Sequence, residues 1–178
     1  MPAPVPVPVR PATAADAPAI AAIWHAGWGD GHLGNVPDEL VPLRTAASFA
    51  ERAGERWPDA VVAEAGGEVA GFVIVTGDEV EQVYVAAAHR GSGVADALMD
   101  EAERRVRDGG HPSAWLAVVP GNGRARRFYE RRGWVDTGPF VYEAFGPAGP
   151  VPVPARRYVK ALAPRLTTPS PPARRAAG

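Results

Sequence analysis

A glycine-rich turn between a strand pattern and a helical pattern is the feature that most constrains the fold of this chain. The strand pattern is EVEQVYV (79–85), the turn is HRGSG (89–93), and a helical pattern then starts near Ser92 and continues to about Asp108. Glycine lets a backbone turn tightly and approach a ligand closely, and the first N–H groups of a helix have no acceptor within it. A strand, turn and helix in this order are typical of a place where an anion binds.

The residues around the turn exclude two common anions. A triphosphate loop needs a lysine after its last glycine, and Lys160 is the only lysine of the chain. A dinucleotide loop needs a third glycine where Asp96 stands, and the next strand ends in Val118-Val119-Pro120 without a carboxylate for a ribose. Two interpretations of the turn remain. Either the backbone amides of residues 90–95 bind a pyrophosphate, or the turn is an ordinary one that binds nothing.

Apolar periodicity and turn residues predict one α/β domain of the α+β type. The first half is expected to hold a strand at 7–10, a helix from Thr13 to about Trp28, a glycine-rich loop at 29–37 and a helix at 45–56. Three strands should follow, at 59–65, 68–77 and 79–85, with Gly66-Gly67 joining the first two. After the glycine-rich turn and its helix, we expect a strand at 113–119, a helix from Asn122 and two last strands before residue 163. Short turns join the strand pairs, so we expect a mixed, mostly antiparallel sheet rather than a doubly wound fold.

Composition narrows the function classes. The net charge is -1, so no basic field favours nucleic acid or an anionic membrane as a partner. The chain has no cysteine, and its four histidines lack paired ligand spacing, so we expect no metal site. No apolar run reaches the length of a membrane span and no leader pattern is visible, which favours a cytoplasmic protein. Nearly all cations are arginine in an Ala-, Gly- and Pro-rich chain, a pattern of GC-rich codon usage, so arginine clusters receive little weight.

The two ends of the chain differ from its middle. Residues 1–6 and 163–178 are rich in proline, and the second segment adds Ser, Thr and Arg. Proline cannot donate the hydrogen bonds of helices and sheets, so a Pro-rich N-terminal extension (1–6) and a disordered tail (163–178) are expected around a domain at 7–162.

Two motifs resemble the signatures of the Gcn5-related N-acetyltransferase (GNAT) superfamily. The first signature, [QR]-x-x-G-x-[GA], corresponds to Ala88-His89-Arg90-Gly91-Ser92-Gly93, in which only Ala88 departs from it. The second, Asn-x-x-Ala-x-x-Phe-Tyr-x-x-x-Gly-[Phe/Trp], is matched in full by the residues Asn122, Ala125, Phe128, Tyr129, Gly133 and Trp134. The resemblance implies a GNAT fold, with a central sheet of six to seven strands flanked by about four helices.

The resemblance also implies acetyl-CoA as co-substrate. Its pyrophosphate would bind the turn, its pantetheine arm would pair with the strand at 79–85, and that strand would splay from the strand at 113–119. The cofactor-binding residues expected from the resemblance are Val83, Tyr84, Val85, Arg90, Gly91, Ser92, Gly93, Val94, Ala95, Asn122, Phe128 and Tyr129. Asn122 is also the natural N-cap of its helix, and both roles can coexist.

Catalytic roles follow from the needs of acetyl transfer. The departing thiolate needs a proton, and the resemblance assigns this acid role to Tyr129, which otherwise would be a core residue. The attacking amine must lose a proton, and Glu81 is preferred over Glu79 as the base, acting directly or through a water. The alternatives are that both are solvated strand carboxylates, or that the amine binds already neutral.

The first helix and its loop are expected to bind the acceptor. Trp28, His32, Leu33 and Glu81 are the proposed contacts, and Tyr142 is expected to cap the other side, whereas Trp24 is assigned to the core. The sequence thus predicts an acetyl-CoA-dependent N-acetyltransferase for a primary amine of a small molecule or peptide, as a monomer or homodimer. The alternative is a non-catalytic acyl-CoA-binding or regulatory module of the same fold.

Overall fold

Seven strands form one mixed sheet in a computed structural model that describes residues 6–164. The sheet order is β1-β2-β3-β4-β5-β7-β6, and only the neighbours β4 and β5 run parallel. The strands are β1 (Val9–Pro11), β2 (Ala60–Ala65), β3 (Glu68–Thr76), β4 (Glu79–Val85), β5 (Ser113–Val118), β6 (Val135–Ala144) and β7 (Val151–Ala161). The predicted mixed, mostly antiparallel sheet is confirmed.

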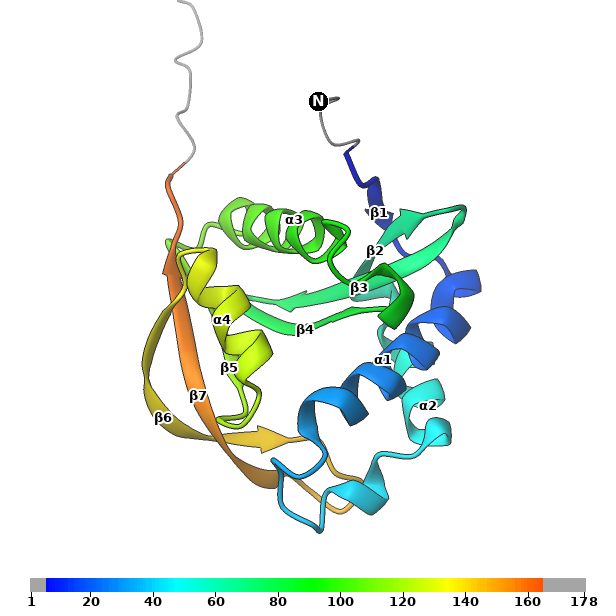
Figure 1. Cartoon of the computed structure of the whole chain (residues 1–178), viewed down its shortest axis with the longest axis vertical. Coiled ribbons are helices and arrows are strands. Elements are labelled where there is room, and N and C mark those ends of the chain that lie inside the picture. Colours follow the sequence, from blue (N-terminus) through cyan, green and yellow to red (C-terminus); the bar gives the residue numbers. More distant parts are fainter. Residues whose placement is uncertain (1–5, 165–178) are drawn as a thin grey trace, which may run out of the picture.

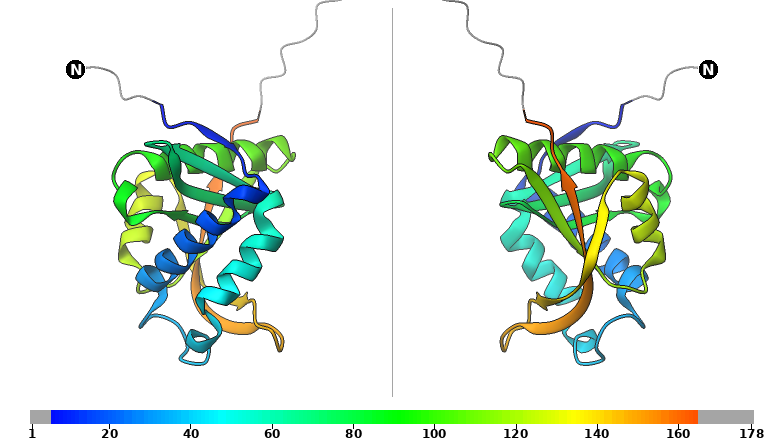
Figure 2. Two further views of the ribbon diagram at one scale, coloured as in Figure 1. Left: turned by 90° about the vertical axis from the view of Figure 1, so that its right-hand side faces the viewer. Right: turned by 90° about the vertical axis from the view of Figure 1, so that its left-hand side faces the viewer.

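Four α-helices cover the two faces of this sheet. They are α1 (Ala17–His32), α2 (Ala46–Arg56), α3 (Val94–Asp108) and α4 (Gly123–Arg131). Helices α1 and α2 pack against one face, and α3 and α4 against the other (Figure 1). Two side views show the same division, with α1 and α2 in front in one and β5, β6 and β7 in front in the other (Figure 2).

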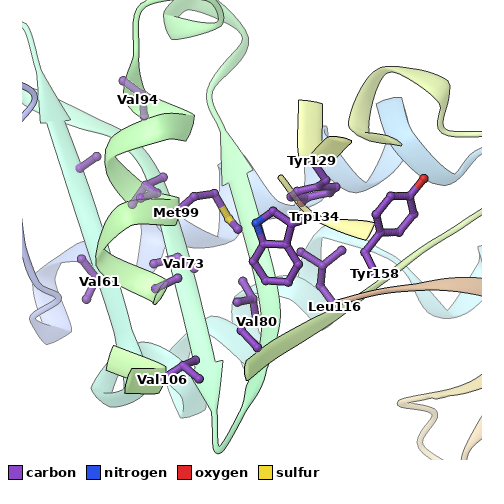
Figure 3. Packing of buried hydrophobic residues seen from close by; sticks show 14 of the residues in the cluster. Val61, Val73, Val80, Val94, Met99, Val106, Leu116, Tyr129, Trp134 and Tyr158 are labelled. Carbon is purple, nitrogen blue, oxygen red and sulfur yellow. The ribbon is translucent and has the colours of Figure 1, made fainter. Parts of the chain in front are cut away.

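Each face has its own hydrophobic core. Under α3 and α4, Met99 packs with strand residues and with Trp134 just after α4 (Figure 3), and Leu98 belongs to the same cluster. Under α1 and α2, Trp24 lies 5.6 Å from Phe49 and 5.5 Å from Phe72, measured between ring centroids. Trp24 is 1% exposed, as expected for a core residue.

The turns explain why the strands pair as they do. Gly66 and Gly67 join β2 to β3 with φ values of 63° and 81°, which only glycine adopts without strain. This is the predicted hairpin. Helix α2 begins after Thr45, whose hydroxyl accepts a hydrogen bond from the Ser48 amide at 3.1 Å.

The predicted glycine-rich loop at 29–37 is wrong in its first four residues. Helix α1 continues to His32, so Gly29 and Gly31 lie in its last turns. A glycine inside a helix costs about 1 kcal/mol relative to alanine, which is why the sequence pattern favoured a loop. At Gly31 close packing offsets this cost, because a Cβ there would lie 2.9 Å from the Asn122 side-chain nitrogen, whereas Gly29 has only an ordinary contact with Leu33.

Two further expectations need adjustment. Helix α3 begins at Val94 rather than near Ser92, since Gly93 has a φ of 86° and ends the preceding turn. The proposed N-terminal extension and C-terminal tail lie outside the described residues, apart from Pro6, Ala163 and Pro164.

Candidate functional site

Strands β4 and β5 meet at one end only. Glu79 and Trp115 form the single register pair between them, supported by a hydrogen bond of 3.0 Å from the Trp115 amide to the Asp78 carbonyl. From there β5 follows β7 and diverges from β4 (Figure 1). The splay expected from the resemblance is confirmed, and the edge of β4 facing β5 is left without a ladder partner beyond this pair in residues 6–164.

A cavity of about 840 Å³ occupies the opening between the two strands. It is lined by residues of α1 and α2 on one face of the sheet and of the glycine turn, α3 and α4 on the other. Backbone and side chains of β4, β5 and the β6–β7 end complete its walls. The cavity therefore lies where the two halves of the sheet separate, with walls from both faces.

A β-bulge in β4 changes the direction of its side chains. Val75 pairs with Val80 and Ile74 with Gln82, so Glu81 is an extra residue on β4. Bulges bend a strand and re-aim its side chains. Glu81 consequently faces α2, whereas Val83 packs in the core under α3 and α4.

The turn after β4 presents free backbone donors. Gly91 and Gly93 have φ values of 77° and 86°, and no acceptor within residues 6–164 is found for the amide groups of residues 91–95. These amides lie at the N-terminus of α3, where the helix dipole is positive. The Arg90 guanidinium pairs with Asp30 at the end of α1, at 2.5 Å. The arrangement suits an anion such as a phosphate.

Tyr129 brings a phenol to the cavity from α4. It is buried, with ring centroids 5.3 Å from Phe128 and 6.2 Å from Trp134, and it lies beside Trp134 in Figure 3. Its hydroxyl makes no hydrogen bond to another described residue, and burial raises the pKa of Tyr129 above its ordinary value. The phenol therefore stays protonated at neutral pH and can donate to a ligand atom.

Two glycines of α1 let this helix close the cavity. A Cβ on Gly27 would lie 2.5 Å from the Tyr84 ring, and one on Gly31 would lie 2.9 Å from the Asn122 side-chain nitrogen. Asn122 also caps α4, since its side-chain oxygen accepts from the Ala125 amide at 3.1 Å. Its NH₂ group has no acceptor in the described part of the chain and remains available to a ligand.

The two carboxylates of β4 differ in their surroundings. Glu81 accepts hydrogen bonds from Arg56 at 2.8 and 2.9 Å and from Thr76 at 2.7 Å. Burial opposes its ionisation, but these bonds outweigh burial and lower the pKa of Glu81. Burial instead raises the pKa of Glu79, which accepts a single hydrogen bond from the Tyr142 hydroxyl at 2.9 Å. Glu79 is thus the better proton acceptor of the two.

Trp28 and His32 form an aromatic wall at the α1 side. Their rings stack with centroids 5.2 Å apart and 6° between planes. His32 Nδ1 lies 3.1 Å from the Trp28 carbonyl, which can only accept, so this nitrogen carries the proton. Burial lowers the pKa of His32 to about 4, so the ring is neutral at pH 7 and its Nε2 can accept a hydrogen bond.

A family model described as Acetyltransferase (GNAT) family matches residues 22–134, well over half of the chain. The chain belongs to the GNAT acetyltransferase family. Two relatives, an uncharacterized N-acetyltransferase of Mycobacterium tuberculosis and one of Mycobacterium bovis, are each 30% identical over 95 residues. The match spans 51% of this chain and 61% of each relative.

Solved structures share the GNAT fold with this chain. A GCN5-related N-acetyltransferase from Rhodopseudomonas palustris is 22% identical with a TM-score of 0.70, covering 90% of this chain and 98% of that one. A putative acetyltransferase from Salmonella typhimurium, solved with acetyl-CoA, is 20% identical with a TM-score of 0.64, covering 95% and 99%. The resemblance stated from the two motifs and the GNAT fold are thereby confirmed.

Most sequence-predicted residues of this GNAT domain line the cavity. They are Trp28, His32, Glu81, Val83, Tyr84, Val85, Arg90, Gly91, Gly93, Ala95, Asn122, Phe128, Tyr129 and Tyr142. Four do not: Glu79, which reaches it through Tyr142, and Leu33, Ser92 and Val94. Leu33 is 55% exposed on the surface, Ser92 donates its hydroxyl to the His89 carbonyl, and the Val94 side chain is in the core.

Sequence reasoning missed two arginines of the GNAT domain. Arg44 and Arg52 line the cavity near α1 and α2. Arg52 follows Phe49 by three residues and precedes Ala53, so a cation stands on the apolar face of an amphipathic helix. An arginine on the apolar face of a helix indicates a binding residue, and it was missed because the abundance of arginine was attributed to codon usage.

The described residues hold neither a metal-type cluster nor a bilayer-length helix. In residues 6–164, no group of three His, Asp or Glu side chains could coordinate an ion. Across the same range, no helix combines the length and apolar composition needed to span a membrane.

Proposed function

We propose that this GNAT domain transfers an acetyl group from acetyl-CoA to a primary amine of a small molecule or peptide. The observation that carries the proposal is the cavity at the single-pair junction of β4 and β5. One side of it presents the free amides of the glycine turn, and its walls include the unpartnered Tyr129 hydroxyl. The Salmonella structure of the same fold, solved with acetyl-CoA, supports the choice of co-substrate.

Each part of the cavity has a task in this proposal. The amides of residues 91–95 bind the pyrophosphate, and the unpaired edge of β4 hydrogen bonds to the pantetheine amides as an added strand would. The Asn122 NH₂ group donates to the same arm. These contacts would place the thioester at the junction, near Tyr129.

The transfer forms a C–N bond and breaks the C–S bond. The amine nitrogen attacks the thioester carbonyl and loses one proton to a base, and the sulfur leaves with one proton from the Tyr129 hydroxyl. A backbone N–H near Val85 would stabilise the oxyanion. Burial keeps the phenol protonated before the transfer but also makes it a weaker acid, so its proton moves only as negative charge develops on the sulfur beside it.

Tyr142 and Glu79 together are the proposed route for the amine proton. Tyr142 lines the cavity and donates to Glu79, so its oxygen can accept from the amine as its own proton moves to the carboxylate. Glu81 was the preferred base on sequence grounds, but its pairing with Arg56 makes it a weak proton acceptor. We propose that Glu81 shapes the acceptor wall instead.

Thiol release from acetyl-CoA against a panel of primary amines tests the transfer. We expect Tyr129→Phe to lower kcat by about tenfold to a hundredfold, while the KM for acetyl-CoA stays unchanged. Trp134→Phe, which alters the same core without touching the hydroxyl, is the matched control. Equal turnover of wild type and Tyr129→Phe would remove Tyr129 from the acid role.

Calorimetric titration with CoA separates the enzyme from a non-catalytic acyl-CoA-binding module. Both bind CoA, but only the enzyme acetylates an amine of the panel. Gly93→Glu places a carboxylate beside the expected phosphate and should abolish CoA binding. Unchanged CoA affinity of Gly93→Glu would mean that the turn is only structural.

A further inference from the structure

The end of the cavity between α1 and α2 holds two cations without acidic partners. Arg44 is 8% exposed, donates from Nη2 to the Phe145 carbonyl at 2.7 Å, and has a buried Nε with no acceptor. Arg52 makes no hydrogen bond or ion pair with any residue in the range 6–164. By contrast, Arg90 of the same cavity pairs with Asp30, and Arg56 of α2 pairs with Glu81.

Phe145 brings the two guanidinium groups to one place, through its ring for Arg52 and its backbone carbonyl for Arg44. The Arg52 carbon Cζ lies 4.3 Å from the centroid of the Trp24 ring and 5.8 Å from that of Phe145. Arg44 binds the backbone of the same Phe145. Trp24 and Phe145 also line the cavity, so the two cations face the same part of its wall.

The charge of Glu81 acts on Arg52 from a distance, but no carboxylate of residues 6–164 forms a hydrogen bond or ion pair with Arg44 or Arg52. Glu81 is taken by Arg56 and Thr76, and the exposed Glu143 forms no ion pair with either arginine. Burial, followed by the charge of Arg44, lowers the pKa of Arg52 to about 10. Burying two neighbouring cations without an anion costs stability, so packing alone gives no reason for them.

We propose that the acceptor amine carries an oxyanion group, a carboxylate or a phosphate, and that Arg44 and Arg52 bind it. The planar guanidinium matches both groups, and water-poor surroundings strengthen the hydrogen bonds. With its anion held here, the amine of a small molecule points toward β4, where Tyr142 and Tyr129 line the cavity. This inference rests on the proposed acetyl transfer and names its acceptor class.

Matched acceptor pairs that differ only in the anion test it. The pairs are alanine and alaninamide, phenylalanine and phenylalaninamide, and aminoethylphosphonate and ethanolamine, compared at equal concentration of neutral amine. We expect kcat/KM to favour the anionic member by about tenfold or more. A preference confined to the amino acids assigns a carboxylate, and one confined to the phosphonate assigns a phosphate. Equal or better use of the neutral members in all pairs would overturn the proposal.

Variants locate the preference. Arg52→Met keeps the stem over Trp24 but removes the charge, so we expect the KM of the anionic acceptor to rise about tenfold or more with that of the neutral member unchanged. Arg44 is buried and tolerates little change of volume, so its variant is Arg44→Lys, which keeps the positive charge. Arg104→Met, on the outer surface of α3, is the control. Equal losses on both members of a pair would assign Arg52 a structural role and overturn the proposal.

A binding measurement keeps this inference separate from the activity. Calorimetric titration of the CoA-saturated protein with phenylalanine, phenylalaninamide and aminoethylphosphonate needs no turnover. Binding of an anionic probe that Arg52→Met weakens supports the anion site even if no amine is acetylated, in which case only the proposed function fails. Acetylation of neutral amines without any binding preference leaves the function standing and overturns the anion site.

Discussion

The Tyr142 hydroxyl donates a hydrogen bond to Glu79 over 2.9 Å and thereby connects the cavity to a carboxylate outside it. Tyr142 comes from β6 and Glu79 from β4, two strands that are not neighbours in the sheet. Because burial raises the pKa of Glu79, its carboxylate accepts a proton more readily than an ordinary glutamate does.

Removing either member of this pair should lower the rate of transfer. We expect Glu79→Gln and Tyr142→Phe to reduce kcat/KM by about tenfold to a hundredfold, since each breaks the proton route. In wild type the rate falls as the pH drops through the raised pKa of Glu79, and Glu79→Gln should lose this acidic limb. Glu55→Gln, an exposed residue of α2, is the control. An acidic limb retained in Glu79→Gln would exclude Glu79 as the base.

Two glycines of α1 provide a matched test of packing. A Cβ at Gly27 would lie 2.5 Å from the Tyr84 ring, so Gly27→Ala should destabilise the protein by about 1–3 kcal/mol. Gly29 has only an ordinary contact of 3.7 Å, so Gly29→Ala should stabilise it by about 0.5–1 kcal/mol through helix propensity. Urea unfolding of both variants measures the difference. The same sign in both would show that α1 does not lie on Tyr84 as described.

The turn before α3 is expected to act through its backbone shape. Gly93→Ala meets no atom within 4 Å but cannot hold a φ of 86° without about 1 kcal/mol of strain, so the KM for acetyl-CoA should rise. Gly66→Ala carries the same kind of strain in the β2–β3 hairpin, at a φ of 63°. The stability of Gly66→Ala should therefore fall by a similar amount, while its KM for acetyl-CoA stays unchanged. Steady-state kinetics and thermal unfolding of the two variants separate these effects.

The Arg56–Glu81 ion pair should stabilise the fold in a pH-dependent way. The folded pKa of Glu81 lies below its ordinary 4.5, so its contribution is complete above that value and is lost as the pH falls through the folded pKa. Glu81→Gln should therefore lower the stability by about 1 kcal/mol at pH 7 and by less in acid. Thermal unfolding across this pH range measures the difference in stability between wild type and Glu81→Gln, which should shrink in acid. A difference that stays constant with pH would contradict the ion pair.

Local patterns predicted most of this fold because local chemistry decides it. The diglycine at 66–67 dictates a tight hairpin, and Thr45 can cap α2 without help from distant residues. The order of the two motifs around β5 placed the cavity residues of the turn and of α4. These features depend on neighbours in the sequence, so the sequence shows them.

Long-range packing decided what the sequence missed. Gly31 looks like a loop residue in the sequence, and only its close contact with Asn122, about ninety residues later, explains a glycine within α1. Arg44 and Arg52 become a pair only through Phe145, about a hundred residues away in the chain. Glu79 and Glu81 are alike in sequence, and only the Arg56 and Tyr142 contacts give them different basicity.

The single register pair between β4 and β5 has a thermodynamic consequence. Two halves of one sheet share almost no backbone hydrogen bonds at their junction, so a bound acyl-CoA arm would complete the sheet between them. Ligand affinity and folding stability are then linked by mass action, with a gain of about 2.7 kcal/mol at a ligand concentration one hundred times the Kd. The co-substrate would thus act as a missing strand, and the domain would be most resistant to unfolding while it is ready to react.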